Sequence, residues 1–478
     1  MPTYAAVDLG ATSGRVVNVR FSADDISLHE VARFPNVAVQ GASGTMFWDI
    51  NQLLASVRAG LTAAAAAAPL RSVAVDSWAI DYGLLDTHNN RVGPVHAYRS
   101  ARTNGVMDAI CKALGRERIY AATGIQFLAF NTAYQLVTSM PTNDYIAAQR
   151  FLMIPDLINA ELCGSNTNEV TNASSTQLLN AATHQWDDGL IADMGLRRSL
   201  FPSLHQPGTR LGQIDGVGAP VDGVPMVAAA SHDTASAVAG TPLRADRPGI
   251  YISCGTWSLI GCELPAPVTT PTALAANVTN ELGLEGRTRL LKNVTGLWLL
   301  EECRRNWADG GIISDISVLV AQASLLEGGA SIIDPDDPAF AAPGDMPARI
   351  AAACAHSGQP IPRSTAEFTR VILDSLALAY RRAVATIEEI AGFRADVVHM
   401  VGGGAANPLL TALCASACER AVLVGPLEAT VVGNALVQAI ADGVITDLDA
   451  GRARIERAFP PHRIEPTKML NWNALQNR

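Results

Sequence analysis

Two short stretches of this sequence combine glycines, hydroxyls and charges in a way that suits phosphate binding. Residues 8–15 read Asp-Leu-Gly-Ala-Thr-Ser-Gly-Arg. Gly10 and Gly14 allow a tight turn and a close approach of the backbone to an anion, and successive N–H groups of such a turn form an anion-binding nest. Asp8 is placed to hold Mg²⁺ through water, because this ion sheds its waters reluctantly. An ordinary glycine-rich hairpin turn is the alternative.

The second stretch, residues 253–258, reads Ser-Cys-Gly-Thr-Trp-Ser. Its Gly255 and Thr256 could meet further phosphates from the other side of a cleft. A third glycine group, residues 402–404, follows an apolar run and precedes a helical pattern. That place suits a flat ligand such as the adenosine end of a nucleotide, although a tight strand-to-helix turn explains this group equally simply.

A single acid in the middle of the chain is a candidate general base. Asp233 follows Ser231 and His232 and precedes Thr234 and a run of small residues. An aspartate is ionised near neutral pH and can accept the proton of a hydroxyl. Phosphoryl transfer needs little more, because positioning and electrostatics provide most of the catalysis. The alternative is structural, since Asp is a favoured helix N-cap.

Other nucleotide-binding classes are excluded by their motifs. The chain has only three lysines, Lys112, Lys292 and Lys468, and none ends a glycine-rich loop as in a P-loop. The lysine and His-Arg-Asp motifs of protein kinases are also absent from the sequence. If the chain handles a nucleoside triphosphate, backbone N–H groups and hydroxyls must therefore hold the phosphates.

The elements that position these residues follow one plan twice. A strand at 4–8, the turn at 10–14 and a strand at 15–21 predict a β-hairpin, since alternation resumes directly after the turn. The pattern of residues 7–13 returns weakly at 252–258, after a Pro/Gly/Arg-rich connector at 241–249. We therefore predict two domains, residues 1–243 and 244–478.

Further elements complete this outline. Helices are predicted at 51–68, 235–240, 364–392, 430–442 and from Asn407 onwards, where Asn407 can N-cap and Pro408 fits the first helical position. Strands are predicted at 72–75, 224–229 and 397–401, and a surface loop at 334–345.

Composition restricts the class of protein. The chain has 478 residues, 49% hydrophobic and 17% charged, with a net charge of −10, which is globular and long enough for two domains. It has no Lys/Arg run for nucleic acid, no apolar run of about 18 residues for a membrane and no signal-peptide pattern. We expect a cytoplasmic protein without an obligate protein partner. Most of its eight scattered cysteines are expected to be buried packing residues. Cys414 and Cys418 share one helix face, so a redox pair is the alternative for these two.

Taken together, the motifs resemble those of the FGGY carbohydrate kinases over almost the whole chain, in the same order and spacing. The stretches that carry this resemblance are 8–15, 231–235, 254–258 and 401–404. The resemblance implies an α/β fold of two actin/hexokinase-like (ribonuclease H-like) domains with an active-site cleft between them. The first domain would bind sugar and phosphate and the second the nucleotide, with ATP and Mg²⁺ as cofactors.

Four longer polar and aromatic stretches are most similar to the branch of this family that phosphorylates L-rhamnulose to L-rhamnulose 1-phosphate. These stretches are residues 98–105, 123–132, 231–238 and 291–300. The resemblance implies Asp233 as the base and Asp8 as the metal residue. It implies sugar contacts from Ala79, Arg102, His232, Asp233 and Thr234, and nucleotide contacts from Ala11, Thr12, Ser13, Gly14, Arg15, Thr256, Asn293, Glu301 and Gly403.

Three positions depart from the family pattern. Ala79 stands where a glycine is expected near the sugar, Ser100 replaces an aspartate beside Arg102, and Glu301 stands where a glutamine would contact the nucleotide. These departures leave a kinase for another ketose, such as L-fuculose or a xylulose, as an alternative. A non-catalytic sugar or nucleotide sensor on the same fold is a second alternative, since a fold does not fix a function. An actin-like or chaperone-like ATPase is a third, but the chain lacks an added partner-binding segment.

Overall fold

The computed structural model describes residues 2–22, 25–244, 247–313 and 315–476. Residues 245–246 of the predicted connector lie outside this range, as does Met1. The chain forms two compact units. Unit 1 comprises Met1–Pro242, Glu263–Leu290 and Ala429–Ala458, and unit 2 comprises Leu243–Cys262, Leu291–Glu428 and Phe459–Arg478. The predicted boundary at residue 243 coincides with the first point where the chain passes from unit 1 to unit 2. Two later segments, Glu263–Leu290 and Ala429–Ala458, also belong to unit 1. Which unit binds sugar and which binds nucleotide stays a prediction.

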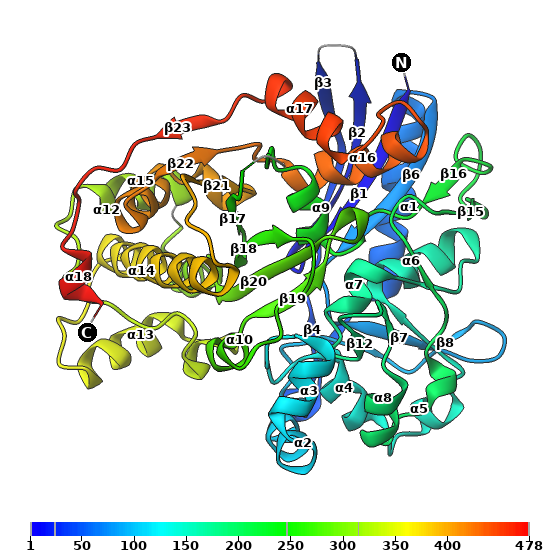
Figure 1. Cartoon of the computed structure of the whole chain (residues 1–478), viewed down its shortest axis with the longest axis horizontal. Helices are drawn as coiled ribbons and strands as arrows, with labels where there is room; N and C mark the ends of the chain where they lie inside the picture. Colours follow the sequence, from blue (N-terminus) through cyan, green and yellow to red (C-terminus); the bar gives the residue numbers. More distant parts are fainter. Residues whose placement is uncertain (1, 23–24, 245–246, 314, 477–478) are drawn as a thin grey trace. The chain divides into compact units, whose positions relative to one another are not determined.

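A mixed sheet forms the centre of unit 1 (Figure 1). Its strand order is β15 (Arg210–Gln213), β16 (Pro225–Val227), β6 (Leu70–Ser77), β1 (Thr3–Leu9), β2 (Ser13–Phe21) and β3 (Ile26–Pro35). β1 is fully buried, and it pairs antiparallel with β2 and parallel with β6. The predicted hairpin is therefore confirmed, with the glycine-rich turn between its two strands.

Two helices of unit 1 matter for the site that follows. α9 (Asp233–Ala239) begins one residue after its N-cap, His232, so the alternative reading of Asp233 as the N-cap is wrong. α9 packs against α16 (Ala429–Ala441), a helix from far along the chain (Figure 1). The strand before α9 is β16, shorter than the predicted 224–229.

The glycines Gly240 and Gly433 lie where α9 and α16 meet. A Cβ on Gly433 would overlap the carbonyl of Ser236 and would lie 2.8 Å from the amide nitrogen of Gly240. A side chain on Gly240 would similarly meet the backbone of Ala429, 3.0 Å from its carbonyl carbon. The two helix backbones are therefore in direct contact, and only glycine fits between them.

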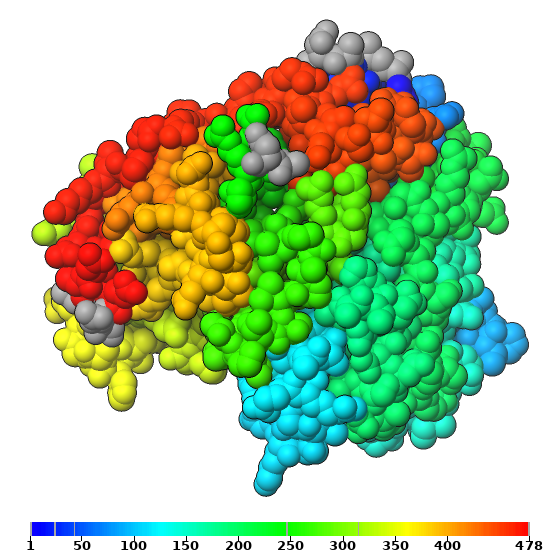
Figure 2. Space-filling view, viewed as in Figure 1, coloured from blue at the N-terminus to red at the C-terminus, as the bar shows by residue number. Residues whose placement is uncertain are grey.

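The rest of unit 1 consists mainly of short helices and hairpins. α1 (Ile50–Ala67) matches the predicted helix, and the side chain of its N-cap Asp49 accepts a hydrogen bond from the amide of Gln52. α17 (Leu448–Ala458) lies on the visible face of the molecule, coloured orange-red in Figure 2. The remaining helices and longer strands are α2 (Val106–Leu114), α3 (Arg116–Thr123), α4 (Thr132–Ser139), α5 (Asn143–Ala147), α6 (Ile154–Cys163), α7 (Val170–Ser174), α8 (Asp188–Asp193), α10 (Pro271–Ala276), β7 (Tyr82–Leu85), β10 (Arg150–Met153) and β19 (Thr279–Leu282).

Unit 2 repeats the strand pattern of unit 1. Six neighbouring strands of its sheet are, in order, β20 (Thr288–Thr295), β18 (Trp257–Leu264), β17 (Ile250–Cys254), β21 (Val397–Val401), β22 (Ala421–Val424) and β23 (His462–Ile464). β17 pairs antiparallel with β18 and parallel with β21, just as β1 pairs with β2 and β6. The weak similarity between residues 7–13 and residues 252–258 therefore reflects a structural repeat.

Two helices of unit 2 begin at side-chain N-caps. α14 (Thr365–Ala391) has a capping box formed by Ser364 and Glu367, and α15 (Pro408–Cys418) starts after Asn407, whose side chain accepts from the amide of Leu410. The predicted loop at 334–345 contains one short turn of 3₁₀ helix, Pro338–Phe340. Cys414 and Cys418 are free and buried, as expected for packing residues. The other helices are α11 (Trp298–Asp309), α12 (Ile316–Ser324), α13 (Met346–His356) and α18 (Trp472–Leu475). Among the described helices, none combines the length and apolarity required to cross a bilayer.

Candidate active site

The ends of two parallel strands bring the candidate residues of unit 1 to one edge of the sheet. Asp8 on β1 is the register partner of Asp76 on β6. The amide of Ser77, at the end of β6, donates to the carbonyl of Ser231 at 2.9 Å, and Ser77 forms a parallel bridge with His232. The phosphate-turn candidate and the turn that carries Asp233 are therefore neighbours.

Asp8 and Arg15 form an ion pair across the hairpin. The Nε and Nη2 atoms of Arg15 lie 2.9 Å and 2.8 Å from Oδ2 of Asp8. The turn itself is closed by a hydrogen bond from the amide of Gly10 to the carbonyl of Ser13, at 2.9 Å. Thr12 is exposed at the tip of the turn. Its hydroxyl and the neighbouring amides are therefore accessible to an anion.

The two glycines of this turn have different structural roles. A Cβ on Gly10 would lie 3.1 Å from the carbonyl oxygen of Ser13, so this position needs a small residue for the turn. A Cβ on Gly14 would overlap the ring of Phe34, whose Cζ atom would be 2.7 Å away. Packing of the Phe34 ring is therefore sufficient to explain Gly14 without an anion.

Asp76 is a buried acid that the sequence analysis did not single out as a site residue. Its Oδ2 atom accepts a hydrogen bond of 2.6 Å from Asn434 on α16, while Oδ1 has no partner among the described residues. Burial, followed by the charge of Asp8, raises the pKa of Asp76 well above its ordinary value. Asp233 adds to this effect. Three carboxyl groups therefore share one small region of unit 1.

This concentration of acids is suited to a hard cation that keeps most of its waters. In the described residues, no group of three or more His, Cys, Asp or Glu side chains is arranged to hold a metal by itself. Mg²⁺ in nucleotide enzymes is held by one or two carboxylates together with substrate phosphates and water. Asp8, beside the accessible phosphate turn, fits that requirement.

Asp233 presents a partly accessible carboxylate at the start of α9. Its side chain is 31% exposed. Oδ1 accepts from the amide and hydroxyl of Thr234 at 2.6 Å and 3.2 Å, and lies 3.4 Å from Nε2 of His232. Burial raises the pKa of Asp233, the nearby His232 opposes this shift, and the charge of Asp8 adds to it. The side chain has the access and the chemistry of a general base.

A second buried acid holds the turn before Asp233. One carboxylate oxygen of Glu169 accepts from the amide of Ser231 at 3.0 Å and from its hydroxyl at 2.8 Å. The same side chain caps α7 by accepting from the amides of Thr171 and Asn172. Glu169, which no motif had singled out, therefore fixes the backbone that leads into the candidate base.

The candidate sugar residues Ala79 and Arg102 are both linked by hydrogen bonds to a buried acid, Asp81. Asp81 accepts hydrogen bonds from the indoles of Trp48 and Trp78 at 2.6 Å and 3.0 Å, and burial raises its pKa to about 6. Ala79 is partly exposed, and its carbonyl accepts from the amide of Asp81.

Arg102 is held mainly by helix α4. Its guanidinium donates to the side chain of Gln135 at 2.9 Å and to the hydroxyl of Ser139 at 2.9 Å. Gln135 in turn donates to Asp81 at 3.0 Å. Arg102 is therefore linked to Asp81 through Gln135. None of its described hydrogen bonds reaches another predicted site residue.

In unit 2 the turn with Gly255 and Thr256 is fixed from behind. The carbonyl of Thr256 accepts from the amides of Gly296 and Trp298 at 3.1 Å and 3.2 Å. The glycine turn after β21 approaches the same strand, because a Cβ on Gly402 would lie 2.8 Å from the carbonyl oxygen of Cys254. Gly403 is exposed, and a Cβ there would meet no atom within 4 Å.

Two further nucleotide candidates lie apart from these turns along the chain. Asn293 is on β20, and Glu301 is exposed on α11, where it pairs with Arg304 at 2.6 Å. In the described interactions Glu301 has a partner on its own helix and contacts no other predicted site residue. Its nucleotide contact stays a prediction.

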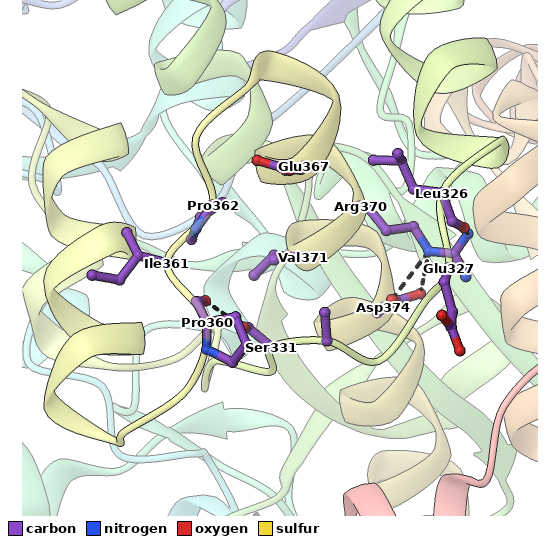
Figure 3. Close-up of a pocket in the computed structure, with 11 residues that line it drawn as sticks. Leu326, Glu327, Ser331, Pro360, Ile361, Pro362, Glu367, Arg370, Val371 and Asp374 are labelled. Atoms are coloured by element: carbon purple, nitrogen blue, oxygen red, sulfur yellow. Dashed lines mark hydrogen bonds and ion pairs between the residues drawn. The ribbon is translucent and has the colours of Figure 1, made fainter.

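A pocket of about 190 Å³ in unit 2 contains none of the predicted site residues (Figure 3). Arg370 and Asp374 line one side, and the Nε atom of Arg370 lies 3.0 Å and 3.1 Å from the two carboxylate oxygens. Arg370 also donates to the carbonyl of Leu326, and Asp374 accepts from the amide of Gly329. The charges of Arg370 and Asp374 are therefore paired with each other.

The sequence matches the N-terminal domain of the FGGY family of carbohydrate kinases over residues 3–240 and the C-terminal domain of that family over residues 250–441. The chain belongs to the FGGY family of carbohydrate kinases.

Two relatives by sequence are proteins named rhamnulokinase. The chain is 43% identical over 468 residues to the rhamnulokinase of Pectobacterium atrosepticum, covering 96% of this chain and 92% of the relative. It is 38% identical over 481 residues to the rhamnulokinase of Bacteroides thetaiotaomicron, covering 98% and 97%.

Solved structures support the fold. The xylulose kinase from Lactobacillus acidophilus superposes with a TM-score of 0.79 at 16% identity, covering 100% of this chain and 96% of that one. Glycerol kinase from Plasmodium falciparum, solved with ADP, gives a TM-score of 0.78 at 13% identity, covering 100% and 97%. The predicted α/β fold of two actin/hexokinase-like domains is therefore confirmed.

Proposed function

We propose that this chain is an ATP-dependent kinase that converts L-rhamnulose to L-rhamnulose 1-phosphate, a step of L-rhamnose catabolism. The observation that carries the proposal is the identity of 38–43% over nearly the full chain to proteins named rhamnulokinase. The geometry of unit 1 is consistent with it, because an accessible carboxylate, Asp233, lies at the same sheet edge as the phosphate turn.

In this proposal Asp233 accepts the proton of the sugar hydroxyl as that oxygen attacks the γ-phosphorus. Thr234 orients the Asp233 carboxylate through the two hydrogen bonds described above. The turn from Ala11 to Arg15 holds phosphate oxygens through amides and hydroxyls. Bound Mg²⁺ would neutralise charge on the phosphates, and Asp8 would hold it through water.

The other residues take the roles implied by the family resemblance. Ala79, Arg102 and His232 would lie near the sugar, and Thr256, Asn293 and Gly403 near the nucleotide. Glu301 would contact the nucleotide only if its pair with Arg304 opened. These assignments are tested residue by residue through separate effects on the KM for sugar and the KM for ATP.

The test is an ADP-release assay with Mg·ATP across ketoses and polyols, followed by NMR of the phosphorylated product. We expect turnover selective for L-rhamnulose and a 1-phosphate product. Selective turnover of another ketose would contradict the substrate and direct attention to Ala79 and Ser100. ATP binding without turnover of any sugar would contradict the kinase proposal and favour a sensor.

Replacement of Asp8 should weaken the dependence on Mg²⁺. We expect Asp8→Ala to lower turnover and to raise the Mg²⁺ concentration for half-maximal activity by roughly 10-fold or more, the scale seen when residues that orient metal ligands are removed. The measurement is a Mg²⁺ titration at fixed ATP.

A matched control for Asp8→Ala is Asp442→Ala. Asp442 forms a similar ion pair with Arg71, 2.6 Å long, elsewhere in unit 1. This variant should retain the wild-type Mg²⁺ titration. An unchanged titration for Asp8→Ala would contradict the metal role of Asp8.

A further inference from the structure

A chain of ionisable side chains extends from Asp233 into the interior of unit 1. His232 lies between two acids. Its Nε2 atom is 3.4 Å from Oδ1 of Asp233, and its Nδ1 atom is 3.2 Å from Oε2 of Glu281. Arg289 lies beside both, with its Nη2 3.1 Å from Glu281 Oε2 and 3.2 Å from His232 Nδ1. His232, Glu281 and Arg289 are all buried, Arg289 completely. Glu281 is on β19 and Arg289 on β20, far from Asp233 in the sequence.

The contacts of the ring allow two neutral proton arrangements, besides a ring protonated on both nitrogens. Arginine is a donor only, and an ionised carboxylate is an acceptor only. His232 Nδ1 therefore either donates a proton to Glu281 or accepts one from Arg289. In the first arrangement a neutral ring has a bare Nε2 facing Asp233. In the second, Nε2 carries the proton and donates it towards Asp233.

The surroundings of Glu281 favour the first arrangement. Burial alone would raise the pKa of Glu281, but its hydrogen bond with His232 and the charge of Arg289 outweigh burial and lower the pKa to about 2. Glu281 is therefore a carboxylate that needs donors. Arg289 already has other acceptors, since its Nε donates to the carbonyl of Leu282 at 3.0 Å and its Nη2 to Glu281.

We propose that Glu281 holds His232 in its Nδ1–H form, so that Nε2 takes over the proton that Asp233 removes from the substrate hydroxyl. This inference rests on the proposed kinase function. The hydroxyl O–H bond breaks as the new O–P bond forms and the bond from phosphorus to ADP breaks. The proton passes to an oxygen of Asp233 and then to Nε2 of His232. After product release, the proton leaves by the reverse path through Asp233 to solvent.

This arrangement gives His232 and Glu281 distinct roles. With both ring nitrogens engaged, His232 acts on Asp233 rather than as a hydrogen-bond partner of the sugar. Glu281 is a positioning residue, because it acts only through His232. The other charged groups that face this pair are Asp8, whose charge raises the pKa of Asp233, and Arg289; Asp76 interacts with Asp233 from β6.

The tautomer of His232 can be measured without any turnover. The wild-type protein, labelled with ¹⁵N in its histidine rings, is compared by NMR with His232→Asn, which identifies the His232 signals among those of the nine histidines. We expect an Nδ1–H signal for His232 near neutral pH. A neutral Nε2–H tautomer, or a ring protonated on both nitrogens, would overturn the relay.

Kinetics of Glu281→Gln provide the second test, because glutamine preserves size and removes the charge. We expect kcat to fall on the order of 10-fold or more and the KM for sugar to change little.

The matched control for this second test is Glu263→Gln. Glu263 is another largely buried acid of unit 1, paired with Arg452 at 2.7 Å, and it has no described contact with His232. It should retain the wild-type kcat and KM for sugar. A wild-type kcat for Glu281→Gln, or an equal loss in Glu263→Gln, would overturn the relay. If Glu281→Gln fails to fold, the tautomer of His232 in the wild-type protein still tests the relay. Absence of sugar turnover in the wild type would instead contradict the kinase function itself.

Discussion

Asp233→Asn should lower kcat by about 100-fold or more while the protein still folds and binds ATP. A positioned acid–base group contributes typically 10²–10⁴-fold to the rate. Asparagine preserves the shape of the side chain and can still accept from Thr234, but it cannot take a proton. The measurement is steady-state ADP release with ATP binding followed separately by calorimetry. Activity within a few-fold of the wild type would remove Asp233 from the role of base.

Asp187→Asn is the matched control for this substitution. Asp187 is the N-cap of α8 in the same unit, and its carboxylate accepts from the amide of Leu190 at 2.8 Å. Asparagine caps a helix about as well as aspartate, so turnover should be unchanged. A comparable loss in both variants would indicate a general structural effect of Asp→Asn changes.

Stability should move in the opposite direction to activity. Because the pKa of Asp233 is raised in the folded protein, folding favours the protonated carboxyl. Its stabilising effect is present at low pH and is lost as the pH rises through the raised pKa. Asparagine resembles the protonated form, so Asp233→Asn should be at least as stable as the wild type near neutral pH. For the same reason, the acid limb of wild-type activity should lie above the ordinary aspartate range near pH 4.

Gly433→Ala should destabilise unit 1 strongly and impair catalysis although it is far from Asp233 in sequence. The added methyl group would overlap the Ser236 carbonyl, with its carbonyl carbon only 2.7 Å away. Backbone cannot move aside as a flexible side chain does, so we expect a loss of about 3 kcal/mol, the upper part of the usual range for overpacking. Urea unfolding followed by fluorescence measures the loss.

Gly189→Ala is the control, since Gly189 is an exposed glycine in α8. Its Cβ would lie at an ordinary distance of 3.4 Å from the nearest atom, Oδ1 of Asp187. Replacing a helical glycine by alanine there should be neutral or stabilising by up to about 1 kcal/mol. If Gly433→Ala unfolds at the same urea concentration as the wild type, the contact between α9 and α16 is not as close as described.

Local patterns predicted the local structure well. The hairpin turn at residues 10–14 and the N-cap at Asn407 depend on residues close in sequence, and both occur where expected. The repeat of the first hairpin in β17 and β18 was visible as a faint pattern because the same backbone turn needs similar small residues.

The residues that surround Asp233 were not predictable in the same way. Glu169, Glu281 and Asn434 occur in stretches without a motif, and each reaches the site only through tertiary packing. Buried acids of this kind resemble surface acids in a single sequence. The family pattern also named Arg102 and Glu301, which bond to Gln135 and Arg304 in the described structure. Their ligand contacts stay predictions.

The packing of α16 against α9 also has a consequence for how the enzyme is made. Asn434 on α16 bonds to Asp76, 358 positions earlier in the chain, and Gly433 supports the helix that begins at Asp233. A ribosome releases the phosphate turn and the base long before it releases α16. Contacts of such long separation form late and slow the search for the native state. The nascent chain should therefore have no kinase activity until nearly all of it has emerged from the ribosome. A prematurely terminated chain would then have no partly formed site that could hydrolyse ATP.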